Sequence, residues 1–380
     1  MTRDVAIAGV GYSAIARDTD RTAGGLAVDA CLAAMQDAGI TTNDVDGIAT
    51  YPGGYDSVPV FYVCEALGLG TLNWFSDLFG YTPAGITPVI AAAHAVALGH
   101  CDVALAYRSL KRHFEPPGMG WGGTGRAPGD MQFRAPFGDT LTSQWLAMWA
   151  MRHMHQFGTT EEHLGHIAVT FRDHASKNPN AALRDPITLE DYFASRIITT
   201  PFRLLDCDYP VDGGGAVVVT SMDRARDLAK PPVKVVDGVF GSGPRPDWEN
   251  WPDLTYMASR FASDRLWQRT GLTAKDVDVA QLYDGFSWLA LCWLEDLGFC
   301  EKGDGGPFVA DGNLKLGGAI PSNTHGGSLS GGRLHAISHV VECVQQLRGE
   351  CGDRQVANAE TGVVTSGGGV MAGALLVQKA

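Results

Sequence analysis

The sequence predicts an α/β protein built from two equivalent halves, and three observations lead to this fold class. The segment AGITTNDVD at residues 38–46 returns in similar form at residues 270–278 as TGLTAKDVD. In each copy a helix pattern runs into Gly and an Asp-led turn, and an apolar strand follows. Helix and strand patterns also alternate along both halves, which is typical of α/β folds with mixed sheets. At 380 residues, the chain is long enough for two ordinary domains or one large pseudo-symmetric unit.

The first half, residues 1–228, shows this alternation in order. An apolar run at residues 5–10 predicts a buried strand, and apolar helical spacing over 22–38 ends at Gly39, a typical helix C-cap. The further predicted elements are a strand at 47–50, a helix at 86–98, a strand at 102–107 and a strand at 215–220. The region 111–200 is interpreted as an insertion. Its part at 111–142 lacks periodicity and favours a lid or binding loop, whereas 143–200 is largely helical in pattern.

The second half, residues 229–380, begins at a Lys-Pro-Pro stretch, which is the best linker candidate. Its predicted elements are a strand at 279–282, a helix at 334–347, and two strands at 362–365 and 370–377 around a glycine turn.

Composition excludes several classes of function. The net charge of −13, without any Lys/Arg-rich run, argues against a nucleic acid or an anionic membrane as partner. No apolar run approaches the ~20 residues of a membrane span. The chain starts directly in a strand pattern without a leader, so we expect a cytoplasmic protein. Low charge, 19%, with 45% hydrophobic residues favours an oligomer that hides apolar surface.

The cysteine and histidine patterns predict no metal site. The eight cysteines show no C-x-x-C spacing, and most lie in apolar patterns typical of buried reduced thiols. His335 and His339 have the i, i+4 spacing of a metal-binding pair on a helix, but the sequence offers no third ligand.

Five segments, taken in order, resemble the thiolase superfamily, specifically its sterol-carrier-protein (lipid-transfer-protein) branch. They are residues 170–181, 211–216, 282–287, 323–327 and 366–369. The resemblance implies a five-layered α-β-α-β-α fold of two duplicated halves, usually a homodimer, acting on coenzyme A thioesters. It implies no permanently bound cofactor, since coenzyme A is part of the substrate.

The chain departs from this family where thiolases carry their acid/base and nucleophilic residues. The turn at residues 79–85, which holds the nucleophilic cysteine in thiolases, contains no Cys. The second family cysteine aligns near Thr365, the family His of Gly-His-Pro falls at Arg333, and Tyr283 replaces the His of His-Asp-Cys-Phe. A covalent acyl-enzyme needs a thiolate or an activated hydroxyl, so these changes argue against thiolysis and Claisen condensation.

With these losses the chain resembles the lipid-transfer-protein aldolases of bacterial steroid side-chain breakdown, which show similar losses and carry Tyr at the position of Tyr283. This resemblance implies retro-aldol cleavage of a β-hydroxyacyl-CoA to a ketone or aldehyde plus a shortened acyl-CoA. It also implies a small OB-fold, zinc-ribbon partner protein. A second Tyr of that branch falls at Arg333 here, which is a departure from the pattern.

Retro-aldol cleavage needs a base, an acid and donors that hold a thioester enolate, but no covalent nucleophile. We expect Tyr283, His325 and Arg333 to be catalytic. Arg333 either favours the Tyr283 phenolate or grips the thioester oxygen. The N–H groups of Gly367, Gly368 and Gly369 are expected to form the enolate hole, and Tyr81 is expected to contact the substrate.

The sequence leaves open which residue is base and which is acid. It also leaves two rival functions: a non-catalytic acyl-CoA- or lipid-binding scaffold for a partner, and an acyltransferase with an atypical nucleophile. Basic candidates for coenzyme A contact, Arg126, Arg172 and Lys230, are scattered along the chain.

Overall fold

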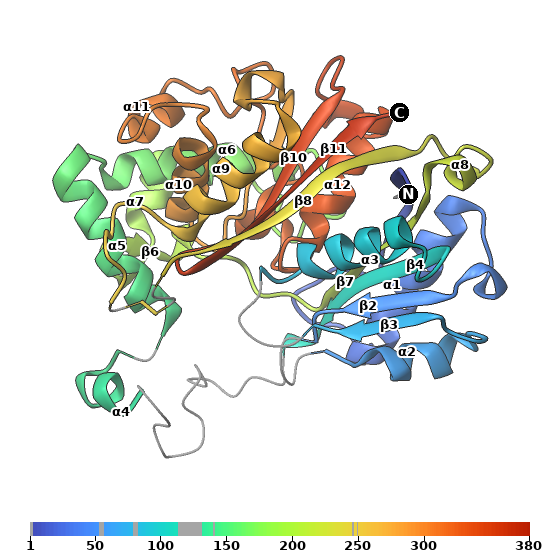
Figure 1. Cartoon of the computed structure of the whole chain (residues 1–380). Helices are drawn as coiled ribbons and strands as arrows, with labels where there is room; N and C mark the ends of the chain where they lie inside the picture. Colours follow the sequence, from blue (N-terminus) through green and yellow to red (C-terminus); the bar gives the residue numbers. More distant parts are fainter. Residues whose placement is uncertain are drawn as a thin grey trace.

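The computed structural model describes residues 3–52, 57–78, 83–112, 131–139, 141–244, 247–248 and 250–380. Figure 1 shows the strands and helices of residues 1–110 in blue to teal on one side and the second half in yellow, orange and red on the other, with the green helices of residues 142–194 beside the second half. The first-half elements are β1 (Val5–Tyr12), α1 (Ala23–Ala38), β2 (Gly47–Thr50), α2 (Val60–Leu67), β3 (Trp74–Asp77), α3 (Ile86–Leu98), β4 (Val103–Leu110) and β7 (Gly213–Ser221). The second-half elements are β8 (Val233–Ser242), α9 (Ala258–Thr270), β9 (Val279–Gln281), α10 (Ser287–Leu297), α11 (Gly305–Ala310), α12 (Ile337–Arg348), β10 (Thr361–Gly368) and β11 (Met371–Lys379).

Nine strands form one sheet in the order β3-β2-β4-β7-β1-β8-β11-β10-β9. The first five strands come from the first half and the last four from the second half. A short antiparallel pairing of β1 with β8, from Val5 with Val235 to Ile7 with Val233, joins the two parts.

Helices cover both parts of the sheet on both faces, which gives five layers. Alternate residues of each strand point to opposite faces. Thus Val103 and Leu105 of β4 pack in a cluster with α1 and α2, whereas Ala104 and Ala106 pack in a central cluster with α3 and α12. In the second half, Val363 of β10 points to an outer cluster with α9 and α10. The predicted five-layered, duplicated fold is therefore confirmed.

The duplicated segment forms the same structure twice. Gly39 and Gly271 end their helices in the left-handed conformation, with φ of 72° and 71°. Each copy continues into a 3₁₀ turn, η1 (Thr42–Asp44) and η5 (Ala274–Asp276), in which the N–H and hydroxyl of the preceding Thr donate to the carboxylate of the last Asp.

The last Asp of each copy performs the same task. Asp46 accepts the backbone N–H of Val103 at 2.8 Å, and Asp278 accepts that of Thr361 at 2.9 Å. Asp46, which precedes β2, therefore holds the start of β4, and Asp278, which precedes β9, holds the start of β10. In both cases the two strands are parallel neighbours in the sheet.

The insertion is largely helical, as predicted for residues 143–200. It contains α4 (Met131–Arg134), η3 (Ala135–Phe137), α5 (Thr142–Phe157), α6 (Glu161–Ser176), α7 (Leu189–Ala194) and β5 (Ile197–Thr199). Just after it, β6 (Phe202–Arg203) pairs with β5 and leads into η4 (Leu204–Asp206). Most of the predicted lid at 111–142 lies outside the described residues. The remaining short elements are α8 (Met222–Ala225), a π-helix η6 (Gly327–Gly331) and η7 (Gly352–Arg354).

The helix predicted for 334–347 begins later, at Ile337. His335 and Ala336 have positive φ values of 50° and 68°, which a right-handed helix cannot contain. His335 therefore lies outside the helix that carries His339, and the expected i, i+4 helical pair does not form.

Candidate active site

The candidate site lies where the first residues of α3 and α12 meet. The backbone N–H of Gly85 donates to the carbonyl oxygen of His335 at 2.7 Å. A Cβ on Gly85 would lie 2.1 Å from that oxygen, so this contact requires glycine. Ala84 and His335 both have positive φ, 36° and 50°. Strained backbone of this kind clusters at functional sites.

Tyr283 follows the end of β9, and its backbone N–H donates to Thr365 Oγ1 at 2.8 Å. Burial raises the pKa of its phenol, Asp208 raises it further, and the nearby Arg333 lowers it by less than these two effects together. Arg333 thus acts on the Tyr283 phenol in the expected direction, but burial and Asp208 outweigh it, so the expected net lowering of the pKa is not found. Arg333 as a ligand of the thioester oxygen stays a prediction.

Arg333 connects the π-helix η6 to α12. Its backbone N–H donates to the carbonyl of Tyr209 at 2.9 Å, and its Nε lies 4.0 Å from Asp208 Oδ2. The side chain remains 22% exposed. This position places a permanent cation beside Tyr283 at the partly open side of the site.

His325 is buried, with 3% of its surface exposed. Its Nδ1 lies 3.1 Å from Gln281 Oε1. Its Nε2 has no hydrogen-bond partner among the described residues. Burial, together with His339, Arg354 and His174, holds the pKa of His325 well below its ordinary value.

Asp284 and His339 are site residues that the sequence reasoning missed. The Asp284 carboxylate accepts the N–H groups of Ser328 and Leu329 at 2.8 and 3.2 Å, which fixes the π-helix. His339 Nε2 lies 3.1 Å from Asp284 Oδ1, and its ring lies 4.7 Å from the ring of His325. The ring of His339 also lies 6.4 Å from that of Tyr283, so it stands next to both predicted residues. No sequence motif indicated this, because the side chains come from separate segments.

Tyr51 was also missed, although the repeat could have indicated it. Tyr51 follows β2 as Tyr283 follows β9, and the two residues occupy the same place after the duplicated segment. The negative charge of Tyr51 would raise the pKa of Tyr283, so the two phenols are neighbours. The Arg108 guanidinium lies 5.3 Å from the Tyr51 ring centre and contacts His335 Nδ1 at 3.2 Å.

The glycines of the predicted enolate hole form the tip of the β10–β11 hairpin. Gly367, Gly368 and Gly369 all have positive φ. The N–H of Gly369 already donates to Met257 Sδ at 3.1 Å. A Cβ on Gly369 would lie 2.0 Å from the ring of Trp248. Gly367 and Gly368 thus remain the better candidates for an enolate hole. Tyr81 lies outside the described residues.

All eight cysteines are free, and burial raises the pKa of each thiol. Cys207 directly precedes Asp208, whose charge raises the pKa of Tyr283. Its Sγ lies 3.5 Å from the carbonyl of Arg203, and Asp208 and Asp206 raise its pKa in addition to burial. These thiols are therefore held in their unreactive protonated form.

A hollow of about 270 Å³ opens beside the start of α3. It is lined by Pro83, Thr87, Phe240, Gly241, Ser242, Met371 and Ala372. Since Pro83 directly precedes Ala84 and Gly85, this mostly apolar surface adjoins the candidate site.

The described residues contain no cluster of three side chains suited to a metal ion, and none of their helices is long and apolar enough to cross a membrane. Of the basic candidates for coenzyme A contact, Arg172 is buried against Ser330 and Lys230 pairs with Glu350. Arg126 lies outside the described residues.

The chain matches known proteins along its whole length. Residues 245–377 match the family described as "Thiolase C-terminal domain-like". The chain is 38% identical to the "Steroid side-chain-cleaving aldolase" of Thermomonospora curvata, over 95% of this chain and 96% of that protein. It is also 38% identical to the "17-hydroxy-3-oxo-4-pregnene-20-carboxyl-CoA lyase" of Mycobacterium tuberculosis, over 99% of this chain and 100% of that protein.

Solved structures agree with these matches. The structure called "Ltp2-ChsH2(DUF35) aldolase" superposes with a TM-score of 0.92 at 36% identity, covering 100% of this chain and 98% of that one. Human mitochondrial 3-ketoacyl-CoA thiolase superposes with a TM-score of 0.73 at 14% identity, over 100% of this chain and 99% of that one, which shows a shared fold. The resemblance inferred from the ordered motifs is thus confirmed, and the chain belongs to the thiolase superfamily, in the branch that contains the steroid side-chain-cleaving aldolases.

Proposed function

We propose that the protein is a carbon–carbon lyase that cleaves a β-hydroxyacyl-CoA by a retro-aldol reaction. The observation that carries this proposal is the 38% identity, over nearly the full length of the chain, to two proteins named as an aldolase and an acyl-CoA lyase. The buried, protonated cysteines also support it, because they argue against a thiolase reaction, which needs a thiolate.

In the proposed reaction a base takes the proton of the β-hydroxyl group. The bond between the α and β carbons then breaks, which leaves a ketone or aldehyde and the enolate of the shortened acyl-CoA. Proton return to the α carbon completes the reaction. We assign Arg333 to the thioester oxygen, because its side chain is a permanent cation and partly exposed. The N–H groups of Gly367 and Gly368 are the remaining candidates for the same developing charge.

Tyr283 and His325 divide the proton transfers in this proposal. The raised pKa of Tyr283 suits a phenol that donates a hydrogen bond or a proton. The lowered pKa of His325 suits a neutral ring that accepts one. Environments that push the pKa values of two groups apart in this way are typical of acid and base partners.

The apolar hollow beside α3 supports a substrate with a bulky apolar acyl part, such as a steroid side chain. Coenzyme A enters as part of that substrate. Cleavage of such thioesters is measured by the appearance of the ketone or aldehyde and of the shortened acyl-CoA.

The test is Tyr283→Phe, which removes one hydroxyl and keeps the ring. We expect kcat to fall about 100-fold, the usual contribution of a proton-transfer group. Tyr209→Phe is the control, because this tyrosine lies near the site and its hydroxyl contacts Arg17 at 2.9 Å. Undiminished cleavage by folded Tyr283→Phe would remove Tyr283 from the mechanism, and no cleavage by the unmodified protein, with or without the partner subunit proposed below, would refute the lyase.

We also propose a homodimer. Strand β3 is an edge of the sheet, and Phe75 on it and Phe61 on α2 are 51% and 58% exposed with their rings 4.9 Å apart. Paired aromatic side chains beside an open strand edge are suited to pairing with a second copy. Light scattering of Phe75→Glu is the test: a monomer supports this interface, and an unchanged dimer refutes it.

A small OB-fold, zinc-ribbon partner is proposed as well. The name of the similar structure, which includes a DUF35 component, supports a second subunit. Cleavage rates with and without such a subunit, co-expressed with this chain, test whether activity depends on it.

A further inference from the structure

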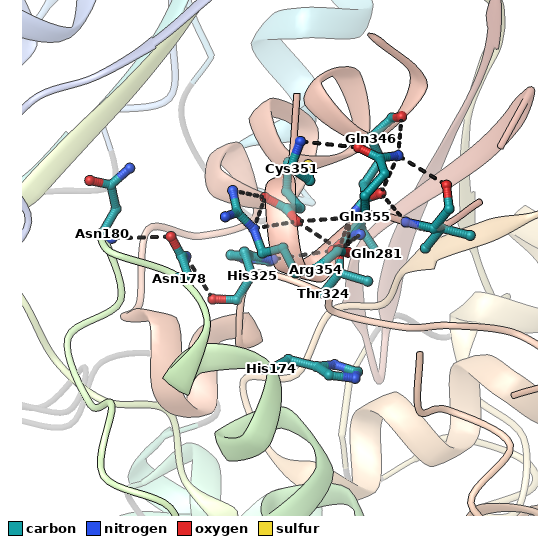
Figure 2. Close-up of polar contacts among 12 residues, drawn as sticks. His174, Asn178, Asn180, Gln281, Thr324, His325, Gln346, Cys351, Arg354 and Gln355 are labelled. Carbon is teal, nitrogen blue, oxygen red and sulfur yellow. Dashed lines mark hydrogen bonds and ion pairs between the residues drawn. The ribbon is translucent and has the colours of Figure 1, made fainter. Parts of the chain in front are cut away.

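One ring nitrogen of His325 has a hydrogen-bond partner, and the other has none among the described residues. Figure 2 shows the ring within a buried polar network from the second half of the chain, beside Gln281 and Thr324. Nδ1 contacts Gln281 Oε1 at 3.1 Å, whereas Nε2 has no partner among the described residues. A buried polar atom without a partner costs about 1–3 kcal/mol. Such an atom indicates a position that a bound molecule completes.

The far end of the network has fixed hydrogen-bond directions. The backbone N–H of Val356 donates to Gln346 Oε1 at 2.8 Å, so Gln346 Nε2 is the atom that donates to Thr324 Oγ1 at 3.0 Å. Arg354, which can only donate, contacts both carboxylate oxygens of Glu342 at 3.0–3.2 Å. Glu342 therefore presents acceptors only.

These donor and acceptor roles determine which ring nitrogen of His325 carries the proton. Thr324 has a single hydroxyl proton, and it donates this proton to Glu342 Oε1 at 2.7 Å. Thr324 Oγ1 must then accept from Gln281 Nε2, at 3.0 Å. Gln281 is thereby oriented with its Oε1 toward His325, and only a protonated Nδ1 satisfies this contact. Nε2 consequently carries a lone pair.

The groups that face the ring keep it neutral. His339 lies with its ring centre 4.7 Å away, and the charges of Arg354 and of a protonated His174 would both repel an imidazolium. His174 itself donates through Nδ1 to the carbonyl of Ser322 at 3.0 Å. Among the described residues no carboxylate contacts the His325 ring, because Thr324 and Gln281 separate it from Glu342.

Building on the retro-aldol activity proposed above, we infer that Gln281, Thr324, Glu342 and Arg354 are positioning residues that hold His325 Nε2 as the acceptor for the substrate β-hydroxyl. In this step the hydroxyl proton moves to Nε2, the electrons of the O–H bond form the new carbonyl, and those of the Cα–Cβ bond pass to the enolate. Tyr283 then gives its phenolic proton to the α carbon and regains a proton from Nε2, so both groups end neutral. The fixed tautomer matters because a proton on Nε2 would block acceptance, and loss of the correct tautomer is costly in other His-dependent enzymes.

The first test is nitrogen NMR of the whole protein labelled with ¹⁵N-histidine. We expect His325 to show a protonated Nδ1 and an unprotonated Nε2, without titration between pH 8 and 6. Nε2–H in the unmodified protein would overturn the inference. This measurement needs no turnover, so it stands even if the proposed activity fails.

The second test is Gln281→Met, which removes the acceptor of Nδ1–H while keeping a side chain of similar length. We expect a mixture of His325 tautomers in the NMR spectrum and a fall in kcat of about 10- to 100-fold, with little change in KM, because coenzyme A binding is untouched.

Gln355→Met is the matched control. Gln355 belongs to the same network, but its side-chain amide donates to Gln346 and Val356, not to Gln281 or Thr324. The N–H of Val356 still fixes the Gln346 amide when Gln355 is replaced. We expect it to keep the tautomer and kcat. Unchanged kcat in Gln281→Met, or an equal loss in Gln355→Met, refutes the positioning role. Inactivity of the unmodified protein on every β-hydroxyacyl-CoA instead refutes the proposed function.

Discussion

Replacement of Lys302 by Met is predicted to destabilise the protein strongly. Lys302 Nζ lies 3.1 Å from Glu295 and 3.4 Å from Asp296, both of which have fully buried carboxylates. The ammonium also lies 4.7 Å from the Tyr256 ring centre. His153 contacts Glu295 at 2.9 Å, so the lysine neutralises a pocket with two adjacent carboxylates and one histidine.

The expected loss follows from this charge count. Removal of one partner from a buried ion pair costs about 3–5 kcal/mol, because the other charge stays buried and uncompensated. Met keeps most of the apolar length of Lys, so lost packing adds little. We therefore expect the free energy of unfolding to fall by about 3–4 kcal/mol at pH 8.

The pH dependence gives a second measurement. Burial already raises the pKa of Asp296 despite Lys302, and without the lysine it rises further. A carboxyl with a raised folded pKa stabilises the fold at low pH and loses that contribution as the pH rises. The deficit of Lys302→Met is therefore expected to be smaller at pH 5 than at pH 8.

Urea denaturation of both proteins at the two pH values is the assay. Lys177→Met is the control, because Lys177 pairs with Asp173 at 2.6 Å on the surface, and exposed pairs contribute at most about 1 kcal/mol. A loss below about 1 kcal/mol for Lys302→Met, or a deficit that shrinks toward pH 8, would show that this reasoning about the buried charges is wrong.

Two further outcomes are expected. Gly327→Ala lowers the melting temperature far more than Gly349→Ala: both glycines have positive φ, but only at Gly327 would a Cβ lie 2.0 Å from Asp284 Oδ2, and equal shifts would contradict the tight contact. Asp206→Asn changes the pH dependence of stability, because burial raises the pKa of Asp206 to about 6. The stabilisation from its protonated form is complete below its unfolded pKa of 3.8 and is lost as the pH rises through about 6. The urea midpoint of the unmodified protein should therefore fall relative to that of Asp206→Asn between pH 5 and 7, and parallel curves would contradict this.

Local patterns predicted much of the fold. The predicted β2 and α3 agree with the observed bounds of 47–50 and 86–98, because glycines and apolar periodicity mark these elements in the sequence itself. The start of α12 was misplaced, since the positive φ at His335 and Ala336 depends on contact with Gly85 of the other half. No local pattern contains such a contact.

The sequence indicated several candidate site residues but not their arrangement. Tyr283 and Arg333 do lie near each other. Arg333 and Asp208 form an ion pair, and the charges of both act on the pKa of Tyr283. The net direction of the Tyr283 pKa was wrong, because burial and the Asp208 charge are properties of the folded chain. The partners of His325 come from three separate segments, so neither its tautomer nor the role of His339 could be read from spacing.

The repeated turns also separate residues that support the fold from residues that we propose for its chemistry. Asp46 and Asp278 act at the beginnings of β2 and β9, whereas Tyr51 and Tyr283 stand just past the far ends of the same strands. Side chains at one end can be exchanged without loosening the anchors at the other. A sulfur nucleophile could thus be lost from this scaffold while its strands stayed in place. Residues at the ends of β2 and β9 that carry Tyr51 and Tyr283 are then free to change toward new reactions.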